Sequence, residues 1–408
     1  MKSDNSFKNE ALRRSLFLYA VTDRRWLGGR SLSSCVQDAI EGGASFVQLR
    51  EKNLDQENFF SEAKELRALC RAKGVPFVVN DNLEIAKKVG ADGVHVGQSD
   101  ASCLEARRLL GPDKIVGVSA STVEQALLAE KQGADYLGVG AVFATGSKDD
   151  ADNVSFEVLK EICASVKIPV VAIGGIGVHN VLRLKGSGIA GISVISGIFA
   201  NDDIKAATKR LALLDKMALG PKAAIFDLDG TLLDSLAAWE GLAAKIVQSF
   251  GGKKLLKEEA AALDKKVFSM SMEDCGKYLI KTYNLNCDCE AAVQEANKIL
   301  LREYENSVAL LPGVLETLKA LKEGGVPICG ATSGSRVLEE AALKRLGIFD
   351  FFEKIFYCSE LKTSKKEALI YKSAADFMGL EPNQVLVVED SREALEAAKS
   401  AGFETFLV

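Results

Sequence analysis

The first half of the chain alternates short apolar runs with longer amphipathic stretches. Apolar residues recur at helical spacing in stretches such as Glu57–Lys73 and Phe156–Val166. Nearly continuous apolar strands between such helices indicate a parallel sheet that helices cover. Eight repeats within residues 1–215 predict a (β/α)8 TIM barrel, with its chemistry at the rim where the strands end. The predicted strands are Leu16–Val21, Phe46–Leu49, Phe77–Val79, Gly93–Val96, Ile115–Val118, Tyr136–Val139, Val170–Ile173 and Gly191–Val194.

The pattern changes after the last predicted barrel helix, Asp202–Leu214. Residues 216–221, which include Gly220-Pro221, are predicted to form a linker. A helical stretch at about 236–310 separates the first two strands of the second half. This order predicts a Rossmann-like open α/β hydrolase domain over residues 222–408, with the helical stretch as its cap. Its predicted strands are Ala223–Phe226, Pro327–Ala331, Lys354–Tyr357, Val385–Val388 and Glu404–Leu407.

Composition excludes several classes of protein. Of the 408 residues, 48% are apolar and 26% are charged, which is typical of folded protein rather than disordered chain. The net charge is −5 without a long block of one sign, so neither a nucleic-acid nor a membrane partner is favoured. No apolar run approaches the ~20 residues of a membrane span. Nine cysteines without a repeating framework indicate a cytoplasmic protein, and a homo-oligomer is left open.

Histidine is scarce, which limits the chemistry further. The chain contains only His95 and His179, and this excludes a histidine-rich zinc site. Any metal ion must then be held mainly by oxygen atoms, which indicates magnesium.

Cationic and amide side chains follow the second predicted strand. Alternation places Gln48, Arg50 and Lys52 on one side of an extended segment. Two cations and an amide suit a polyanion such as pyrophosphate. A solvated loop with paired charges explains the same residues equally well.

Acidic side chains follow the next two strands. Asn80-Asp81 follows the third strand and Asp100 follows the fourth. Two carboxylates beside an anion site suit a magnesium–pyrophosphate clamp. Taken singly, each aspartate is explained as the N-cap of the helix that follows it.

The later strands end in small and hydroxyl-bearing residues. Thr145, Ser147 and Lys148 follow strand six, and glycine-containing turns follow strands seven and eight. Backbone N–H groups at such turns bind phosphate in many barrels, although a tight turn needs glycine for its own reasons.

These motifs occur together in one known family. Residues 14–214 resemble thiamin-phosphate synthase in the stretches VQLREKN (47–53), VVNDN (78–82), GADGVHVGQSD (90–100), GPDKIVGVSAST (111–122), GADYLGVGAVFATGSK (133–148) and VVAIGGI (170–176). The resemblance implies condensation of hydroxymethylpyrimidine pyrophosphate with a thiazole phosphate. Arg50 and Lys52 would act with magnesium on the leaving pyrophosphate. The loop at 144–147 departs from the family, with Ala144 and Gly146 where proline is common.

The resemblance also implies a role for each matching residue. Those implied to contact substrate are Gln48, Arg50, Lys52 and Asn80 for the pyrophosphate and pyrimidine, Ser119 for the pyrimidine side, Thr145, Ser147 and Lys148 for the thiazole phosphate and leaving group, and Gly175, Ile195 and Ser196 for the phosphate cup. Asp81 and Asp100 match the magnesium ligands. A sister group isomerises the thiazole with a histidine after strand five; residues 119–122 hold none, which favours the synthase.

A second acidic motif opens the second domain. Asp227 and Asp229 follow an apolar strand and face the same way, which suits a nucleophilic carboxylate beside one that moves protons. An acidic turn is the alternative. Further polar residues at strand ends favour a site at this edge of the sheet: Thr332, Lys365, Glu389 and Asp390.

Residues 222–408 resemble the haloacid-dehalogenase-type phosphatases. The resemblance implies that Asp227 attacks phosphorus, that Asp229 serves as acid and base, and that Thr332 and Lys365 hold the phosphoryl group. The metal ligands it implies are Asp390, Glu389, Asp227 and the Leu228 or Asp229 backbone, which gives one magnesium site per domain. Ser333 stands where asparagine is frequent, and the lysine motif lacks its usual prolines.

The pairing of the two domains predicts a two-step enzyme. The product of the first reaction, thiamin phosphate, is a phosphomonoester that the second domain would hydrolyse. Three alternatives remain at this point: a phosphatase acting on another metabolite phosphate, a phosphomutase, and a regulatory or ligand-binding protein with one inactive site.

Overall fold

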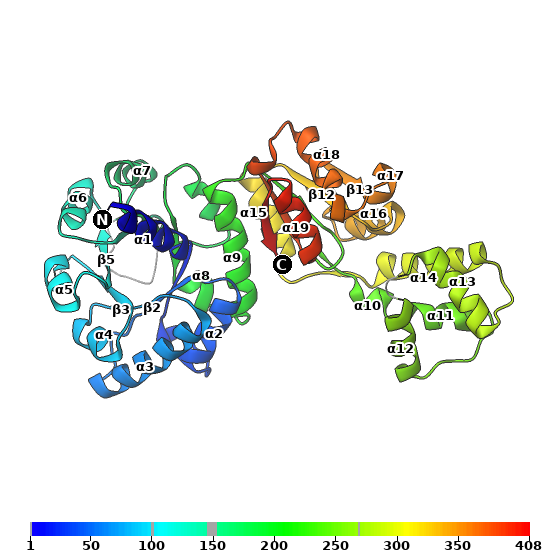
Figure 1. Ribbon diagram of the computed structural model, residues 1–408, viewed down its shortest axis with the longest axis horizontal. Coiled ribbons are helices and arrows are strands. Elements are labelled where there is room, and N and C mark those ends of the chain that lie inside the picture. The colour runs from blue at the N-terminus through cyan, green and yellow to red at the C-terminus, as the bar shows by residue number, and fades with distance from the viewer. Residues whose placement is uncertain (1, 99–101, 145–152, 268–269) are drawn as a thin grey trace. The chain divides into compact units, whose positions relative to one another are not determined.

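The computed structural model describes residues 2–98, 102–144, 153–267 and 270–408. Within it the chain forms two compact units, Met1–Pro221 and Lys222–Val408 (Figure 1). Helix α9 continues to Leu219, so the linker expected at 216–221 is shortened to Gly220-Pro221. The helix is longer than predicted because Met217 and Ala218 are buried and extend its apolar face.

The first unit is a closed barrel in which each strand pairs in parallel with the next and β8 pairs with β1, as predicted. Its strands are β1 (Leu18–Val21), β2 (Phe46–Leu49), β3 (Phe77–Asn80), β4 (Gly93–Val96), β5 (Ile115–Ala120), β6 (Tyr136–Val139), β7 (Val170–Ile173) and β8 (Gly191–Val194). Its helices are α1 (Lys2–Ser15), α2 (Leu32–Glu41), α3 (Gln56–Lys73), α4 (Leu83–Val89), α5 (Cys103–Leu110), α6 (Val123–Lys131), α7 (Phe156–Ser165), α8 (Ser196–Phe199) and α9 (Ile204–Leu219), with 3-10 turns η1 (Arg24–Trp26) and η2 (Val181–Leu184).

Side-chain caps fix where the barrel helices begin. The residue before the first turn accepts a backbone N–H in α2, α3, α4, α5, α6, α7 and α9, through Ser31, Asp55, Asn82, Ser102, Thr122, Ser155 and Asp203. The caps of α4 and α5 are therefore Asn82 and Ser102, so the aspartates 81 and 100 are not needed for that purpose.

Aromatic side chains fill the interior of the barrel below its rim. Tyr19, Phe46 and Tyr136 pack edge to face, with ring centroids 4.6 to 5.9 Å apart. All three are buried, and they join the cluster formed by Leu16, Val78 and Val171. This layer closes the barrel from within and leaves the space above it for a ligand.

The second unit is a parallel sheet in the order β13-β12-β9-β14-β15 with an inserted group of helices. Its strands are β9 (Ala223–Phe226), β12 (Ile328–Thr332), β13 (Lys354–Tyr357), β14 (Val385–Glu389) and β15 (Glu404–Leu407), and a separate antiparallel pair is β10 (Leu233–Asp234) and β11 (Ala309–Leu310). The helices around the sheet are α15 (Val314–Glu323), α16 (Arg336–Arg345), α17 (Cys358–Leu361), α18 (Leu369–Met378) and α19 (Arg392–Ser400), with 3-10 turns η3 (Phe349–Phe351), η4 (Lys365–Glu367) and η5 (Pro382–Gln384).

The inserted helices lie where the cap was predicted. They are α10 (Leu236–Trp239), α11 (Leu242–Ser249), α12 (Lys257–Val267), α13 (Met272–Tyr283) and α14 (Cys289–Asn306). Helix α14 packs against α11 and α13 and also against α16 of the sheet domain. Arg345 of α16 donates hydrogen bonds to the carbonyls of Tyr304 and Val308, which fixes the end of α14.

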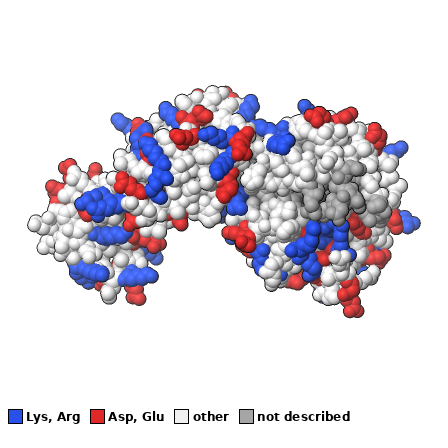
Figure 2. All heavy atoms as spheres, turned by 180° about the vertical axis from the view of Figure 1, so that it is seen from behind, with Lys and Arg blue, Asp and Glu red and all other residues white. Residues whose placement is uncertain are grey.

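The surface carries no strong electrostatic signal on the face that Figure 2 shows. Lys and Arg side chains alternate there with Asp and Glu side chains, among the residues that the structure describes. None of the described helices combines the length and the apolar character that a membrane crossing requires.

Candidate functional site

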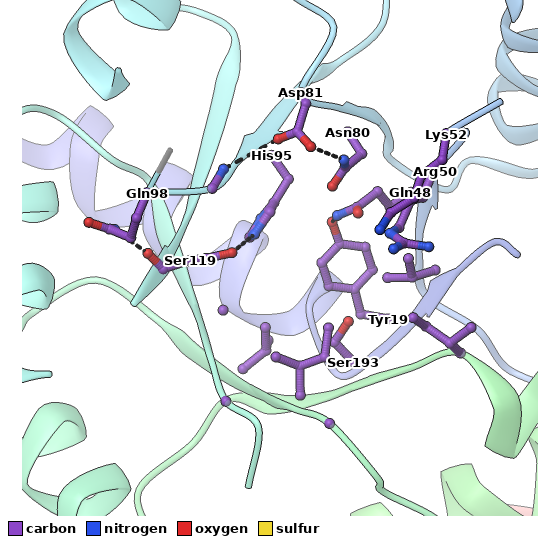
Figure 3. Close-up of a pocket in the computed structure, with 18 of the residues that line it drawn as sticks. Tyr19, Gln48, Arg50, Lys52, Asn80, Asp81, His95, Gln98, Ser119 and Ser193 are labelled. Atoms are coloured by element: carbon purple, nitrogen blue, oxygen red, sulfur yellow. Dashed lines mark hydrogen bonds between the residues drawn. The ribbon is translucent and has the colours of Figure 1, made fainter. Parts of the chain in front are cut away.

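A cavity of about 930 Å³ opens at the rim of the barrel, above the aromatic layer (Figure 3). Strand ends from around the barrel line it, and its volume suits a small-molecule site. The predicted substrate residues found along its wall are Gln48, Arg50, Lys52, Asn80, Ser119, Gly175, Ile195 and Ser196, together with the predicted metal ligand Asp81. The remaining candidates, Asp100, Thr145, Ser147 and Lys148, lie outside the described residues.

Asp81 has a local geometry that aims its carboxylate at the cavity. Its backbone is left-handed, with φ of 59°, and its N–H donates to the carbonyl of His95 at 2.9 Å. Its side chain accepts hydrogen bonds from the Asn80 amide and, at 3.3 Å, from the N–H of Gly97. Because Asn82 caps the following helix, the N-cap interpretation of Asp81 is wrong. Asp81 thus lies in the wall of the cavity.

Arg50 supplies positive charge on one side of the cavity. Its N–H donates to Thr22 Oγ1 at 3.0 Å, and its guanidinium lies 3.8 Å from a carboxylate oxygen of Asp23. Burial opposes ionisation of Asp23, but hydrogen bonds from Arg25 and the charge of Arg50 keep its pKa below the usual value. An ionised Asp23 thus orients Arg50, while Lys52 is exposed at the cavity edge.

A chain of buried hydrogen bonds connects two opposite walls of the cavity. Gln48 donates to Tyr19 OH, which lies 2.8 Å from Tyr136 OH. Tyr136 OH lies 2.9 Å from His95 Nδ1, and His95 Nε2 lies 3.0 Å from Ser119 Oγ. Burial raises the pKa of both tyrosines, so both hydroxyls stay protonated. The chain fixes Gln48 and Ser119, which both contribute polar atoms to the cavity (Figure 3).

The second unit has a smaller cavity of about 320 Å³ at the carboxyl edge of its sheet. It gathers the six predicted residues of this unit: Asp227, Asp229, Thr332, Lys365, Glu389 and Asp390. They come from β9, β12, η4 and β14, which converge because parallel strands end at one edge.

Lys365 connects two acids at the floor of this cavity. Its Nζ donates to Asp227 and, at 2.6 Å, to Glu389. Thr231 Oγ1 donates to the other oxygen of Asp227 at 2.8 Å. Burial raises the pKa of Asp227 and the charge of Glu389 adds to this, while Lys365 opposes it. Burial acts to lower the pKa of Lys365, but the two carboxylates raise it overall, so the lysine stays cationic.

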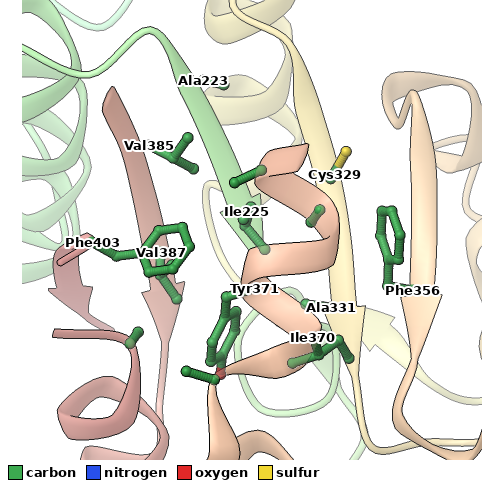
Figure 4. Packing of buried hydrophobic residues seen from close by; sticks show 14 of the residues in the cluster. Ala223, Ile225, Cys329, Ala331, Phe356, Ile370, Tyr371, Val385, Val387 and Phe403 are labelled. Atoms are coloured by element: carbon green, nitrogen blue, oxygen red, sulfur yellow. The ribbon is translucent and has the colours of Figure 1, made fainter. Parts of the chain in front are cut away.

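A hydrophobic cluster supports the floor of the second cavity. Ile225, Ala331 and Val387 from three strands pack against Tyr371 of α18 (Figure 4). The Tyr371 hydroxyl lies at the edge of this cluster and donates a hydrogen bond to Glu389 at 3.3 Å. The site therefore lies directly against the hydrophobic core of the sheet.

Three acids form a group that could hold a metal ion. Asp227, Glu389 and Asp390 each place one carboxylate oxygen within 4.8 Å of the others. Oxygen donors of this kind suit magnesium. The carboxylate of Asp229 is outside this group and accepts a hydrogen bond from Tyr304 OH at 2.7 Å. If Asp229 binds the metal ion, it would therefore do so through its backbone carbonyl and not through its side chain.

Comparisons with known proteins match the two units of the chain to two different families. Residues 18–198 match the family model described as thiamine monophosphate synthase. The thiamine-phosphate synthase of Clostridium novyi is 50% identical over 196 residues, which cover 48% of this chain and 96% of that protein. The chain belongs to the thiamine monophosphate synthase family. Residues 224–408 match the model described as haloacid dehalogenase-like hydrolase, which assigns the second unit to that family.

Two solved structures are each similar to a part of this chain. The thiamine phosphate pyrophosphorylase of Pyrococcus furiosus has 41% identity and a TM-score of 0.48, and covers 51% of this chain and 100% of that one. The structure of CbbY from Rhodobacter sphaeroides in complex with phosphate has 20% identity and a TM-score of 0.39, and covers 46% of this chain and 85% of that one.

Several residues at the two sites were not anticipated from the sequence. In the synthase-family unit, Tyr19 and Tyr136 lie inside predicted strands, where their pattern is that of ordinary core. In the hydrolase-family unit, Tyr304 comes from the cap, and Glu339 lies buried against Thr332 with an oxygen 2.5 Å from its hydroxyl. The one available signal is that Glu339 occupies a buried position in an otherwise amphipathic helix.

Proposed function

We propose that the chain is a bifunctional enzyme of thiamin synthesis. The first unit would join hydroxymethylpyrimidine pyrophosphate to thiazole phosphate, giving thiamin phosphate and pyrophosphate. The second unit would hydrolyse thiamin phosphate to thiamin and phosphate. The observation that supports the first step most strongly is the cavity that collects Gln48, Arg50, Lys52, Asn80 and Asp81 in a member of the synthase family.

In the first reaction the C–O bond to pyrophosphate breaks, and the thiazole nitrogen captures the resulting pyrimidine-methyl cation. This step depends on stabilising the charge that develops on pyrophosphate. Arg50 and Lys52 would bind that charge, and Asp23 keeps Arg50 oriented. Gln48 and Ser119, fixed by the hydrogen-bond chain, would orient the pyrimidine.

In the second reaction Asp227 attacks phosphorus while the bond to the alcohol oxygen breaks. Asp229 gives that oxygen a proton, and later removes a proton from the water that cleaves the aspartyl phosphate. Lys365 and Thr332 would hold the transferred phosphoryl group, since both line the cavity beside Asp227.

Magnesium fits the donor sets of both sites. Asp227, Glu389 and Asp390 would hold it in the second unit, and Asp81 together with Asp100 in the first. When bound, it would neutralise charge on the phosphate oxygens.

Thiamin phosphate is the proposed substrate of the second unit because the two proposed reactions are carried by one chain. The first reaction would make a phosphomonoester, and the acids grouped with Lys365 at one edge of the sheet support phosphomonoester hydrolysis as the second reaction. Linking two sites on one chain raises the local concentration of a shared intermediate where the geometry allows it.

A substrate panel tests the second assignment. The full chain with magnesium is given thiamin phosphate, glycerol phosphate and several sugar phosphates, and phosphate release is measured. We expect the highest kcat/KM for thiamin phosphate. A higher value for another phosphomonoester would replace thiamin phosphate as the substrate, and isomerised sugar phosphate without phosphate release would indicate a mutase.

Replacing Asp81 tests the synthase assignment. Asp81→Ala should lower pyrophosphate release by about 100-fold or more, because the leaving group loses its metal-held charge stabilisation. Asp202→Ala, at an exposed position, is the matched control. Pyrophosphate release at the wild-type rate in Asp81→Ala would contradict the assignment.

A further inference from the structure

Ser193 is a buried polar side chain inside the barrel. It lies on β8, is 2% exposed and lines the barrel cavity (Figure 3). Its hydroxyl oxygen has no hydrogen-bond partner among the described residues. A buried hydroxyl without a partner is costly, and an apolar side chain at this position would avoid the cost. Its place in the wall of a binding cavity therefore indicates a partner that the ligand supplies.

A second serine of the same unit has the same burial without access to the cavity. Ser187 is also 2% exposed, and its hydroxyl also has no partner within the part of the chain that the structure describes. It is not one of the described residues that line the barrel cavity. The two serines therefore separate the effect of a buried hydroxyl on stability from its effect on a ligand.

The sheet register places Ser193 beside Tyr19. Ser193 pairs with Tyr19 of β1 on one side and with Ile173 of β7 on the other. Tyr19 belongs to the aromatic layer, and its hydroxyl accepts a hydrogen bond from the Gln48 amide that is proposed to orient the pyrimidine. Ser193 also comes two residues before Ile195, so it lies deeper in the barrel than the strand end predicted to bind the thiazole phosphate. The serine thus lies on the side of the proposed pyrimidine subsite.

The hydrogen-bonding groups of the two proposed substrates differ. A serine hydroxyl has one O–H and two lone pairs. An aminopyrimidine edge offers an N–H donor and ring nitrogen acceptors, and either kind of atom can pair with the hydroxyl. The thiazole ring has a single nitrogen, and its lone pair must stay free because it forms the new bond to carbon. The pyrimidine is therefore the better partner.

We propose that Ser193 is a substrate-binding residue whose hydroxyl forms a hydrogen bond with the aminopyrimidine ring of the first substrate. This rests on the proposed synthase reaction and adds a residue to those that the resemblance implies. The contact would give the buried hydroxyl a partner and would hold the ring near Tyr19 and Gln48.

Alanine variants of the full chain test stability first. Ser193→Ala and Ser187→Ala each remove a buried hydroxyl that has no partner among the described residues. Without ligand, both variants should therefore unfold within about 3 °C of wild type or above it. A larger fall for Ser193→Ala would show that its hydroxyl stabilises the fold, and would overturn the proposal.

Calorimetry then measures binding of hydroxymethylpyrimidine pyrophosphate with magnesium, in the absence of thiazole phosphate. Ser193→Ala should bind it about tenfold more weakly, because one buried hydrogen bond is lost. Ser187→Ala should bind it as wild type does. The KM for thiazole phosphate should change by less than about threefold in both variants. Equal pyrimidine affinity in wild type and Ser193→Ala, or a loss confined to thiazole phosphate, would overturn the proposal.

Analogues of the pyrimidine pyrophosphate show whether the contact is direct. One analogue lacks the exocyclic amine, and others carry C–H in place of one ring nitrogen. The analogue that lacks the partner of Ser193 should bind wild type and Ser193→Ala with equal affinity. If the variant loses the same factor for every analogue, the hydroxyl does not contact the ring and the proposal fails.

Product formation separates this proposal from the proposed function. If wild type makes thiamin phosphate and Ser193→Ala binds the pyrimidine equally well, the contact is wrong and the reaction stands. If wild type binds the pyrimidine more tightly than Ser193→Ala but makes no thiamin phosphate, the contact stands and the reaction is wrong. Absence of pyrimidine binding to wild type would contradict both.

Discussion

Asp215 is a carboxylic acid on the buried side of α9. It follows Leu211 by four residues and Thr208 by seven, which places it on the stripe that faces the barrel. It is fully buried, and neither carboxylate oxygen has a hydrogen-bond partner among the described residues. Burial therefore raises the pKa of Asp215 well above its usual value.

This burial predicts how stability changes with pH. The pKa of Asp215 is higher in the folded state than in the unfolded state. Its contribution to the free energy of unfolding is therefore fully present only below the pKa of the unfolded state, and it is lost as the pH rises towards the pKa of the folded state. At pH 7 the free energy of unfolding of Asp215→Asn should therefore exceed that of wild type by about 2 kcal/mol. The variant should accordingly unfold at a higher temperature. The gain should shrink towards pH 4.

Thermal unfolding between pH 4 and pH 8 measures this effect. Asp202→Asn, at an exposed position, should show no such trend. A stability difference for Asp215→Asn that stays constant across the range would contradict the interpretation.

At the scale of elements, the cap is connected to the proposed acid–base residue. Tyr304 at the end of α14 donates to Asp229, and Trp239 of α10 donates to Tyr304 OH at 3.2 Å. The Tyr304 carbonyl is held by Arg345 of α16. Two cap helices thus determine where the Asp229 carboxylate lies.

Loss of this connection should slow the second reaction. Tyr304→Phe keeps the ring but removes the hydrogen-bond donor to Asp229, so we expect about tenfold lower kcat for phosphate release from the loss of this one hydrogen bond. Tyr278→Phe, elsewhere in the cap, is the control. Pyrophosphate release by the first unit should be unchanged in both variants, and an unchanged kcat in Tyr304→Phe would contradict the role.

The elements themselves were largely predictable, and the side-chain network was not. Strand β2 lies at the predicted Phe46–Leu49 because a strand buried on both faces gives a nearly continuous apolar run, which only Gln48 interrupts here. Strand ends then locate Gln48, Arg50 and Asp227. Tyr136 shares the pattern of core residues, and Tyr304 lies 75 residues from Asp229, so only tertiary packing reveals their contacts.

At the scale of the whole molecule, each described site is built within one unit. The barrel cavity is lined by residues before Pro221, and the second cavity by residues after Lys222. Each unit also has its own hydrophobic cluster. We infer that each reaction depends on its own unit alone.

Separate production of the two units tests this independence. Residues 1–221 should release pyrophosphate from the two precursors, and residues 222–408 should release phosphate from thiamin phosphate, each within about threefold of the full chain. Circular dichroism checks that each part is folded. A folded unit without activity, restored by adding the other, would show that the sites depend on each other.

The most direct test of the two-step account supplies both precursors and magnesium to the full chain and follows pyrophosphate, thiamin phosphate, thiamin and phosphate over time. Wild type should convert the precursors to thiamin, with pyrophosphate and phosphate released in equal amounts. Asp227→Asn should release pyrophosphate at the wild-type rate while thiamin phosphate accumulates. If wild type itself accumulates thiamin phosphate and releases no phosphate, the second step is wrong.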